Sequence, residues 1–363
     1  MKIKAALFRE PNKLLVIEEV EIDQPGPREV LVRTVASGVC HSDLHYVHGL
    51  LPLKTPAILG HEPAGIVEAV GSAVTSVKPG DHVIACTSIY CGNCTQCLYG
   101  RPHLCVNRGE CQRSASEPPR LSQNGAPIHQ FVDLAAFAEQ MLLHERAVVK
   151  IDDDIPLDRA ALLGCSVTTG VGAALNTAQV APGSSVAVFG AGGVGISVIQ
   201  GARIAGARQI IAVDLLDNKL ALAKHFGATH TINASSIDAV REIKRLSNGG
   251  VDYSFEAIGN RQVAEQCFYC LAPRGTATIV GAIPAGQKIE LNAGHFFVEK
   301  RIQGCYMGSN RFHIDMPRYL DLYRQGRLNL DDMVSRHGRL ADVNEAFRAM
   351  EAGEVTRTVL MFQ

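Results

Sequence analysis

Strands and helices alternate through the middle of the chain, and this alternation restricts the fold more than any other feature. After Ala181-Pro182-Gly183, short apolar runs with strand character are separated by segments with a helical pattern. Six such runs can be counted, at 185–189, 209–214, from 230, 251–259, 276–282 and 301–307. Strands joined by helices of about 10–15 residues form right-handed βαβ units. The sequence therefore predicts a six-stranded parallel sheet with helices on both faces.

A glycine-rich turn follows the first predicted strand. Residues 190–195 read Gly-Ala-Gly-Gly-Val-Gly and precede a helical pattern. In this context, G-x-G-x-x-G indicates a dinucleotide site, because its glycines allow the tight turn, the approach of the pyrophosphate and the packing of helix on strand. The N-terminus of the helix adds free N–H groups. The candidate cofactor contacts are Gly190, Gly192, Gly193, Val194 and Gly195.

An acidic residue, Asp214, ends the second predicted strand, about 20 residues beyond Gly195. A carboxylate there accepts hydrogen bonds from both hydroxyls of the adenosine ribose and repels a 2′-phosphate. The expected cofactor is therefore NAD and not NADP. The alternative is an ordinary glycine turn followed by a helix-capping Asp, and the combination of strand, helix and acid disfavours it.

The N-terminal part of the chain has a different pattern. From Lys2 to Val83, apolar runs are short and alternate with polar residues, and Pro and Gly interrupt them, as at 25–27 and 78–80. This pattern predicts a β-rich domain. Residues 86–130 are rich in Cys, Arg and Pro without clear periodicity, which predicts long loops. The tail after Asp315 returns to mixed helix and strand.

Charge and length exclude several classes of protein. The 363 residues carry 35 Lys+Arg and 36 Asp+Glu, for a net charge of -1. We therefore expect no nucleic-acid partner and no anionic membrane partner. No apolar run reaches the ~18 residues of a membrane span, and the N-terminus is expected to be a strand, not a signal peptide. A cytoplasmic protein of about two domains is the expectation.

Four cysteines lie close together within the loop region. Cys91, Cys94, Cys97 and Cys105 form the pattern C-x2-C-x2-C-x7-C. Four thiolates suit a closed, tetrahedral zinc site that stabilises a loop. An iron–sulfur cluster is the alternative, but bacterial ferredoxins place the fourth cysteine after three residues and before Pro, whereas Val106 follows here. The odd total of 11 cysteines argues against a disulfide framework.

Further metal donors are dispersed along the chain. The segment 40–43 (Cys-His-Ser-Asp) is expected to close a strand, and the segment 60–62 (Gly-His-Glu) opens another one. Together with Cys165, Cys40 and His61 would provide the Cys2His donor set of a catalytic zinc with an open fourth position. Sequence spacing does not show that these three residues converge. Taken alone, such a cysteine is more often a small buried apolar residue and such a histidine more often a hydrogen-bonded polar residue than a metal ligand.

Taken together, these motifs resemble the zinc-dependent medium-chain alcohol dehydrogenases along essentially the whole chain. The motifs follow the order of the family, at 40–43, 60–65, 91–105, 164–170 and 190–195. The resemblance implies an α/β fold with two domains. Residues 1–166 and 307–363 would form a GroES-like, β-rich catalytic domain, and 167–306 would form a doubly wound, NAD-binding Rossmann domain. The length between Cys105 and Cys165 resembles the dimeric animal and class III branch, so a homodimer joined at the Rossmann sheet edges is expected.

The resemblance also implies roles for the metal donors. Cys40, His61 and Cys165 would bind a catalytic zinc, and the four clustered cysteines a structural zinc, which makes two zinc ions per subunit. Glu62 would lie beside the catalytic metal. Asp43 would hold the other ring nitrogen of His61, which is how a ligand imidazole is usually oriented.

The implied reaction is reversible hydride transfer from an alcohol to NAD, giving an aldehyde or a ketone. The proton would leave through the hydroxyl of Ser42, the nicotinamide ribose and His45, while His48 is a competitor in the same segment. Histidine suits such a relay because it ordinarily titrates near neutral pH. Further family positions for cofactor contact are His41, Thr169, Lys219 and Arg357. For Lys219, a solvated helix lysine is the alternative.

The substrate is less well defined by sequence. Leu51, Thr87 and Phe131 match substrate-lining positions of the family, and their apolar character favours aliphatic, aromatic or terpenoid alcohols. Formaldehyde dehydrogenases that use a glutathione adduct carry acids in the loop matching 49–54, which here reads Gly-Leu-Leu-Pro-Leu-Lys, and Arg108 lies one residue early for their basic position. A polyol dehydrogenase and a non-catalytic nucleotide-binding protein are the remaining alternatives.

Overall fold

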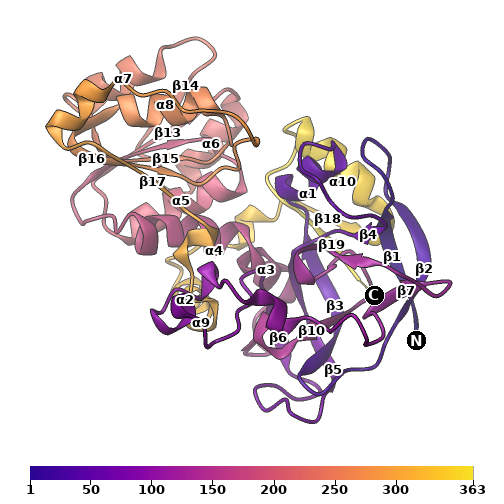
Figure 1. Ribbon diagram of the computed structural model, residues 1–363. Coiled ribbons are helices and arrows are strands. Elements are labelled where there is room, and N and C mark those ends of the chain that lie inside the picture. The colour runs from indigo at the N-terminus through magenta and orange to yellow at the C-terminus, as the bar shows by residue number, and fades with distance from the viewer. Residues whose placement is uncertain (363) are drawn as a thin grey trace. The chain divides into compact units, whose positions relative to one another are not determined.

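Two compact units make up the protein in a computed structural model that describes residues 1–362 (Figure 1). The first unit comprises Met1–Cys165, Arg311–Asp321 and the chain from Leu330 onward. The second unit comprises Ser166–Asn310 and Leu322–Asn329. This division places 307–310 and 322–329 in the second unit, and the domain limits expected from the sequence remain a prediction.

The second unit contains a six-stranded parallel sheet in the order β14-β13-β12-β15-β16-β17. Its strands are β12 (Ser185–Phe189), β13 (Gln209–Asp214), β14 (His230–Asn233), β15 (Val251–Glu256), β16 (Leu271–Ile279) and β17 (Arg301–Gly304). The order reverses at β12, because the chain steps outward first to one side of this strand and then to the other. The predicted doubly wound sheet is therefore confirmed, and ligands of such sheets bind where the order reverses.

Helices connect these strands and pack on the sheet (Figure 1). They are α5 (Gly193–Ile204), α6 (Asp217–His225), α7 (Ala239–Leu246) and α8 (Arg261–Tyr269), and α4 (Ser166–Gly172) precedes β12. Side chains fix where two of these helices begin. Asp238 accepts a hydrogen bond from the backbone N–H of Arg241 in α7, and Asn260 accepts one from that of Val263 in α8. Such N-caps satisfy backbone donors that the helix itself leaves free.

The first unit is built on two sheets. One has the order β8-β7-β2-β1-β4-β9, and the other has the order β11-β6-β5-β3-β19-β18, with β10 also paired to β3. The N-terminal strands are β1 (Lys2–Phe8), β2 (Val16–Ile22), β3 (Glu29–Gly38), β4 (Ala57–Ile58), β5 (Glu62–Val70) and β6 (His82–Ala85). The later strands are β7 (Leu121–Gln123), β8 (Ala126–Pro127), β9 (His129–Gln130), β10 (Gln140–His144), β11 (Val148–Ile151), β18 (Arg336–Arg339) and β19 (Thr358–Met361).

Strand β3 is the central strand of the second of these sheets. It pairs antiparallel with β5 on one side and with the C-terminal β19 on the other. Figure 1 shows the yellow C-terminal strands within the same unit as the indigo N-terminal strands. Most residues of β3 are buried, which suits a run such as Val30-Leu31-Val32. The β-rich character predicted for this part of the chain is confirmed.

Short helices complete the first unit. They are α1 (His41–Val47), α2 (Thr95–Leu98), α3 (Leu157–Ala161) and α10 (Val343–Glu351), while α9 (Phe312–Arg324) runs from the first unit into the second. The loops predicted for 86–130 are present, interrupted by α2, short 3-10 turns and the small strands β7–β9. Two arginines hold this region to β3: Arg113 and Arg120 both donate hydrogen bonds to the carboxylate of Glu29.

No single helix within residues 1–362 is both long and apolar enough to cross a membrane. One bent pair of helices, Leu157–Gly164 with Ser166–Thr177, passes that test together, and residues 160–174 of this pair are buried inside the protein.

Candidate functional site

The four clustered cysteines converge in the first unit as the sequence predicts. Cys91, Cys94, Cys97 and Cys105 bring their sulfur atoms within 4.8 Å of one another. The Sγ–Sγ distances are 3.5 Å between Cys94 and Cys97 and 3.9 Å from Cys91 to Cys97 and from Cys94 to Cys105. Four sulfurs at about 2.3 Å from a tetrahedral zinc would be about 3.8 Å apart. The observed spacing therefore fits a closed zinc site.

Backbone N–H groups point at these sulfurs. The N–H of Cys91 donates to Sγ of Cys105 at 3.2 Å, and that of Cys94 donates to Sγ of Cys91 at 3.3 Å. Backbone hydrogen bonds from Cys97 and Val106 lower the pKa of Cys94 to about 6. Such donors stabilise thiolates, which are the form that binds metal.

A second group of metal donors is fully buried in the same unit. Cys40, His61, Glu62 and Cys165 bring one donor atom each within 4.8 Å of the others. The structure thus answers the question that spacing left open, because two thiols and an imidazole that are far apart in sequence do converge. Such a set of two sulfurs, one nitrogen and one carboxylate oxygen suits Zn²⁺.

Strand pairing explains why these residues meet. In the register of β3 with β5, Gly38 lies opposite Glu62, and in the register of β3 with β19 it lies opposite Val359. Cys40 follows Gly38 and His61 precedes Glu62, so the two ligand candidates leave neighbouring strand ends. Gly38 is required here, since a Cβ at this position would collide with the carboxylate of Glu62. Gly164, just before Cys165, packs closely on Glu62, where a Cβ would lie 3.0 Å from the Cα atom.

The segment 40–43 differs from its prediction. It was expected to close a strand, but β3 ends at Gly38, Cys40 is the N-cap of α1, and residues 41–43 form its first turn. The helix forms because Asp43 reaches back, with Oδ2 accepting a hydrogen bond from the backbone N–H of Cys40 at 3.3 Å. The consequence is that Ser42 and His45 lie three residues apart on one face of a helix.

Asp43 also contacts the candidate ligand histidine. Its Oδ1 lies 3.0 Å from Nδ1 of His61 and accepts a hydrogen bond from the backbone N–H of Gly60 at 3.0 Å. Both side chains are buried. This contact leaves Nε2 of His61 for the donor cluster, and it is the orientation of a ligand imidazole that the sequence predicted.

A buried ion pair adjoins the cluster. The guanidinium of Arg357 pairs with Glu62, and both side chains are almost completely inaccessible to solvent. Burial raises the pKa of Glu62 to about 7, opposed by the charge of Arg357, while a charge on Cys40 raises it further. The pKa of Cys165 is likewise raised, by a hydrogen bond with Cys40, by burial and by the charges of Cys40 and Glu62. Negative charges crowd one another at this position, and a bound cation would relieve their repulsion.

The second unit presents the glycine motif at the end of β12. Gly190 has a φ of +93°, and Gly192 is the N-cap of α5. A Cβ on Gly195 would collide with the carbonyl oxygen of Gly190, which is why this helix can begin so close to the strand only at glycine. Four of the five candidate residues are glycines, and a Cβ on Gly192 would meet nothing within 4 Å, so there is space for an anion at the N-terminus of α5.

Asp214 ends β13 beside this turn. Its Oδ2 accepts a hydrogen bond from the backbone N–H of Ala191 at 2.8 Å, and its Oδ1 accepts one from that of Leu215 at 2.8 Å. The carboxylate therefore stabilises the glycine turn through a hydrogen bond. Its predicted contact with the ribose of the cofactor stays a prediction.

Comparison with known proteins gives a consistent result. Residues 26–153 match the alcohol dehydrogenase GroES-like domain, and residues 193–325 match the zinc-binding dehydrogenase family. The chain is 38% identical to S-(hydroxymethyl)glutathione dehydrogenase of Paracoccus denitrificans, with 100% of each chain covered. It is 39% identical to alcohol dehydrogenase class-3 of Zea mays, with 99% of this chain and 97% of that one covered. The crystal structure of benzyl alcohol dehydrogenase from Acinetobacter calcoaceticus covers 100% of both chains with a TM-score of 0.95 and 34% identity.

The chain belongs to the zinc-dependent medium-chain alcohol dehydrogenases.

Membership in this family makes the protein an oxidoreductase of class III-like type, with a GroES-like domain and a Rossmann domain. Zinc and NAD(P) are the cofactors of the family, and the two donor clusters of this dehydrogenase could each hold zinc.

Other residues selected from the sequence are placed as follows. The ring of Phe131 packs edge-on against His61, with centroids 5.6 Å apart, so it borders the buried cluster. Thr87 is buried just beyond β6, and Leu51 is half-buried in the loop after α1. Ser42 Oγ lies 3.7 Å from Sγ of Cys40. His48 Nε2 lies 3.3 Å from the carboxylate of Glu351.

Three predicted cofactor contacts are also placed. His41 is exposed in the first turn of α1, and Lys219 is half-buried in the first turn of α6. Thr169 is buried in α4, where its hydroxyl contacts the sulfur of Met307 at 3.5 Å. The pairing of Arg357 with Glu62 was missed by sequence reasoning. Glu62 begins β5 and Arg357 directly precedes β19, so no local pattern could have indicated the pairing.

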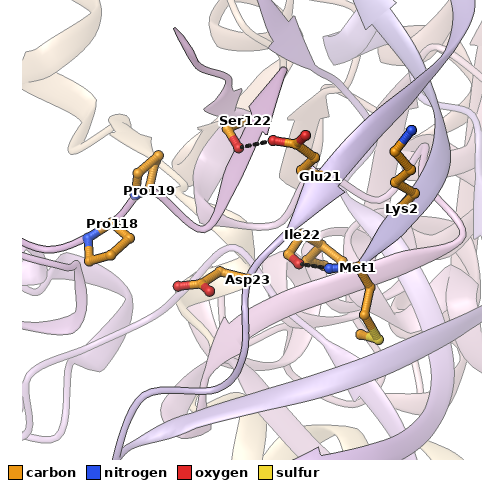
Figure 2. Close-up of a pocket in the computed structure, with 8 residues that line it drawn as sticks. All are labelled: Met1, Lys2, Glu21, Ile22, Asp23, Pro118, Pro119 and Ser122. Atoms are coloured by element: carbon orange, nitrogen blue, oxygen red, sulfur yellow. Dashed lines mark hydrogen bonds between the residues drawn. The ribbon is translucent and has the colours of Figure 1, made fainter. Parts of the chain in front are cut away.

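A surface hollow of about 440 Å³ lies elsewhere in the first unit. Figure 2 shows it between the ends of β1 and β2 and the segment that carries Pro118 and Pro119. The N-terminal ammonium group donates to the carbonyl of Ile22 at 2.7 Å, and Ser122 bonds to Glu21 beside it. The lining contains none of the metal donors described above, so this hollow is not part of either candidate metal site.

Proposed function

We propose that the protein is an NAD-dependent alcohol dehydrogenase that oxidises uncharged, apolar primary alcohols reversibly to aldehydes. Secondary alcohols would give ketones by the same chemistry. The observation that carries this proposal is the buried group of Cys40, His61, Glu62 and Cys165. Two sulfurs and one imidazole are the donor set of a zinc that keeps a position open for substrate.

In this proposal Cys40, His61 and Cys165 hold the catalytic zinc, and Asp43 orients His61. When bound, the metal would lower the pKa of the alcohol hydroxyl, and NAD would accept the hydride. The carboxylate of Glu62 is paired with Arg357, whose positive charge partly offsets its negative charge beside the ligand set. Cys91, Cys94, Cys97 and Cys105 hold the structural zinc.

The chain's own side chains would carry the proton out of the buried site. Ser42 stands beside Cys40 and would accept the proton of the alcohol. His45 lies on the same face of α1, half-buried, and would receive the proton by way of the nicotinamide ribose and release it to solvent. Histidine is the side chain that most often carries out such proton transfers.

Cofactor binding is assigned to the glycine turn and its surroundings. Gly190, Gly192, Gly193, Val194 and Gly195 would face the pyrophosphate, and Asp214 the adenosine ribose. The remaining contacts proposed are those of His41, Thr169, Lys219 and Arg357. The Nε atom of Arg357 is buried without a hydrogen-bond partner within the described chain, which leaves this guanidinium a donor beyond its pairing with Glu62.

An apolar substrate is favoured by the surroundings of the cluster. Phe131 packs against His61, and the family positions of Leu51 and Thr87 add an aliphatic and a small side chain. The similar fold of a benzyl alcohol dehydrogenase supports an aromatic substrate. A pocket with such a lining gives no partner to the additional hydroxyls of a polyol.

Oxidation of a glutathione adduct of formaldehyde is the second candidate, because a relative at 38% identity is named S-(hydroxymethyl)glutathione dehydrogenase. The structure gives a reason against it. Arg108, the cation nearest to the expected basic position, donates to the backbone oxygen of Thr87 and lies 3.7 Å from the carboxylate of Asp133. Its guanidinium is therefore engaged within the protein, and the loop 49–54 contains no acid.

We also propose that the enzyme is a homodimer joined through the second unit. Strand β17 ends the parallel sheet and pairs with β16 alone within the described chain. The short 3-10 helix just before it, Ala293–Val298, presents Phe297 with 92% of its surface exposed, beside the exposed Phe296 and Val298. An unpaired edge next to exposed aromatic rings is typical of a surface that a second copy covers.

Light scattering should give twice the 39.0 kDa of one chain, and Phe297→Asp should shift the measured mass toward that of one chain. Leu98→Asp, at an exposed leucine of the cysteine loop, should not.

The deciding experiment combines metal analysis with initial rates. Purified enzyme should contain two zinc ions per subunit, and benzyl alcohol with NAD should give the highest kcat/KM in a panel that includes sorbitol and formaldehyde with glutathione. Cys165→Ser should keep the fold and one zinc but lose turnover. Cys94→Ser should also lose one zinc and, in addition, unfold at lower temperature, because structural zinc supplies folding free energy.

Each other outcome has a definite meaning. Stoichiometric iron or normal turnover by Cys165→Ser would reject the zinc assignment. A preference for the glutathione adduct or for sorbitol would replace the substrate proposed. Cofactor binding without turnover of any alcohol would favour the non-catalytic alternative.

A further inference from the structure

A carboxylate without an assigned role is buried in the second unit, at the end of β15. The side chain of Glu256 is inaccessible to solvent. Its Oε1 accepts hydrogen bonds from three consecutive backbone N–H groups, those of Ile258 at 2.9 Å, Gly259 at 2.7 Å and Asn260 at 3.2 Å. A single acceptor thus holds the entire turn between β15 and α8. Asn260 is also the N-cap of α8, so the carboxylate fixes the start of that helix as well.

This turn packs on the first glycine of the dinucleotide motif. The N–H of Ala257 donates to the carbonyl of Phe189, the last residue of β12, at 2.9 Å. A Cβ on Gly190 would lie 2.7 Å from the side chain of Ile258 and 3.2 Å from the carbonyl of Ala257. On the other side, the backbone carbonyl of Glu256 accepts from Val280 and Gly281, which follow β16. The residue therefore connects three strand ends at the edge where the sheet order reverses.

We propose that Glu256 is a positioning residue for the dinucleotide, which holds the turn 257–260 against Gly190 and so keeps one wall of the nucleotide site in place. This inference rests on the proposed function, since it takes the glycine turn to be the cofactor site. The exposed side chain of Ile258 would then be presented to the cofactor by a backbone that the carboxylate keeps in one conformation.

The hydrogen-bond acceptor, and not the charge, is the property this role requires. Burial raises the pKa of Glu256, while hydrogen bonds from the backbone N–H groups of residues 258–260 and of Gly281 oppose this rise, so backbone donors and not a neighbouring cation hold the carboxylate. The second oxygen, Oε2, faces Gly281, where a Cβ would lie 2.5 Å from it. Glutamine can place its carbonyl oxygen where Oε1 is and its amide where Oε2 is, whereas methionine keeps the length of the side chain but offers no comparable acceptor.

The test measures NADH binding and backbone exchange in Glu256→Gln and Glu256→Met. In Glu256→Met, three buried N–H groups lose their acceptor, and the turn should populate other conformations. If the competent conformation falls to about one tenth, the Kd for NADH and the KM for NAD rise about 10-fold. The KM for alcohol should stay constant. Hydrogen exchange at Ile258, Gly259 and Asn260 should accelerate, and Glu256→Gln should restore both affinity and protection.

Ser254→Ala is the matched control. Ser254 lies on the same strand, is equally buried, and donates to the backbone oxygen of Cys267 in α8 at 2.7 Å. This variant should melt at lower temperature with unchanged NADH affinity and unchanged exchange at 258–260.

Two results would overturn the inference. One is a Glu256→Met variant that melts earlier but binds NADH as the parent does, and the other is normal exchange at 258–260 in that variant. If the unmodified enzyme binds NADH but turns over no alcohol, the proposed function fails and the comparison of variants still stands. If it binds no NADH, the exchange data alone decide whether Glu256 holds the turn, and the assignment of the cofactor site is what fails.

Discussion

Asp43 contacts His61 and Gly60 with the same carboxylate oxygen, each at 3.0 Å. The aspartate sits in the first turn of α1, so this contact connects the helix that carries Ser42 and His45 to the segment that carries the candidate ligand. A single side chain thereby fixes the orientation of the imidazole and the position of the proposed proton path.

Asp43→Asn should weaken zinc binding at the catalytic site alone. An amide holds His61 less strongly and lowers the basicity of its ring, and losing such a partner costs about 10–100-fold in metal affinity. Chelator titration should show one zinc lost faster and the other retained.

The control is Asp81→Asn. Asp81 is another buried aspartate of the same unit, and it accepts a hydrogen bond from the backbone N–H of Lys78 and pairs with the ammonium group of Lys150 at 2.7 Å. That change should lower stability without changing either zinc. Equal zinc retention in both variants would contradict the role of Asp43.

Asp214 should decide the choice of cofactor. We expect NAD to be preferred over NADP by at least about tenfold in kcat/KM, which is about 1.4 kcal/mol. Asp214→Gly should narrow this preference by removing repulsion of the 2′-phosphate, and Asp214→Asn should narrow it too. The glycine variant should also melt earlier, because it loses the hydrogen bonds to Ala191 and Leu215.

Asp217→Asn is the control for this prediction, since it removes a neighbouring charge from the exposed first turn of α6. Its cofactor preference should equal that of the parent enzyme. A narrowed preference in the glycine variant but not in the asparagine variant would assign the effect to the turn and not to the charge.

His45→Gln should slow alcohol oxidation near neutral pH by about 10-fold. The loss should shrink at higher pH, where solvent accepts the proton directly, and on addition of a small buffer base. His48→Gln should behave as the parent does, because His48 contacts Glu351 at the end of α10 and has no part in the proposed path. Identical pH profiles for His45→Gln and the parent enzyme would reject the relay.

His144 should make stability depend on pH below neutrality. Burial lowers its pKa from 6.5 to about 4, with nearby arginines lowering it further and Glu145 opposing. Because the unfolded chain takes up a proton near pH 6.5 and the folded chain does not, stability is fully present above that pH. It declines as the pH falls toward 4. Between pH 7.5 and 5.5 the loss should be about 1 kcal/mol.

His144→Asn tests this prediction. Nδ1 of His144 accepts a hydrogen bond from the backbone N–H of Arg146 at 3.1 Å, and the oxygen of asparagine can take the same bond. Urea unfolding of the variant should no longer show this loss of unfolding free energy between pH 7.5 and 5.5. If parent and variant lose equal stability over this interval, His144 is not the group that titrates.

Much of the fold follows from local pattern. Each of the six strands of the second unit overlaps the apolar run expected for it, although β16 begins at Leu271 and not at 276. The cluster of Cys91, Cys94, Cys97 and Cys105 could also be predicted, because the cysteines are so close in sequence that one loop brings them together. The segment 40–43 shows the limit of such reasoning. An apolar run leads into it, but the capping side chain of Asp43 turns it into a helix.

The sequence by itself thus determined the sheet, the glycine turn and the cysteine cluster, which depend on residues close together in the chain. Only the tertiary structure decided which of the dispersed residues meet. Glu62 and Arg357 are 295 positions apart, and they pair because β5 and β19 both flank β3 at Gly38. Glu256 shows the same limit, since nothing in its own segment indicates that β16 and the glycine turn will pack around it. Strand register and the close packing of glycines create these contacts, and both depend on the whole sheet having formed.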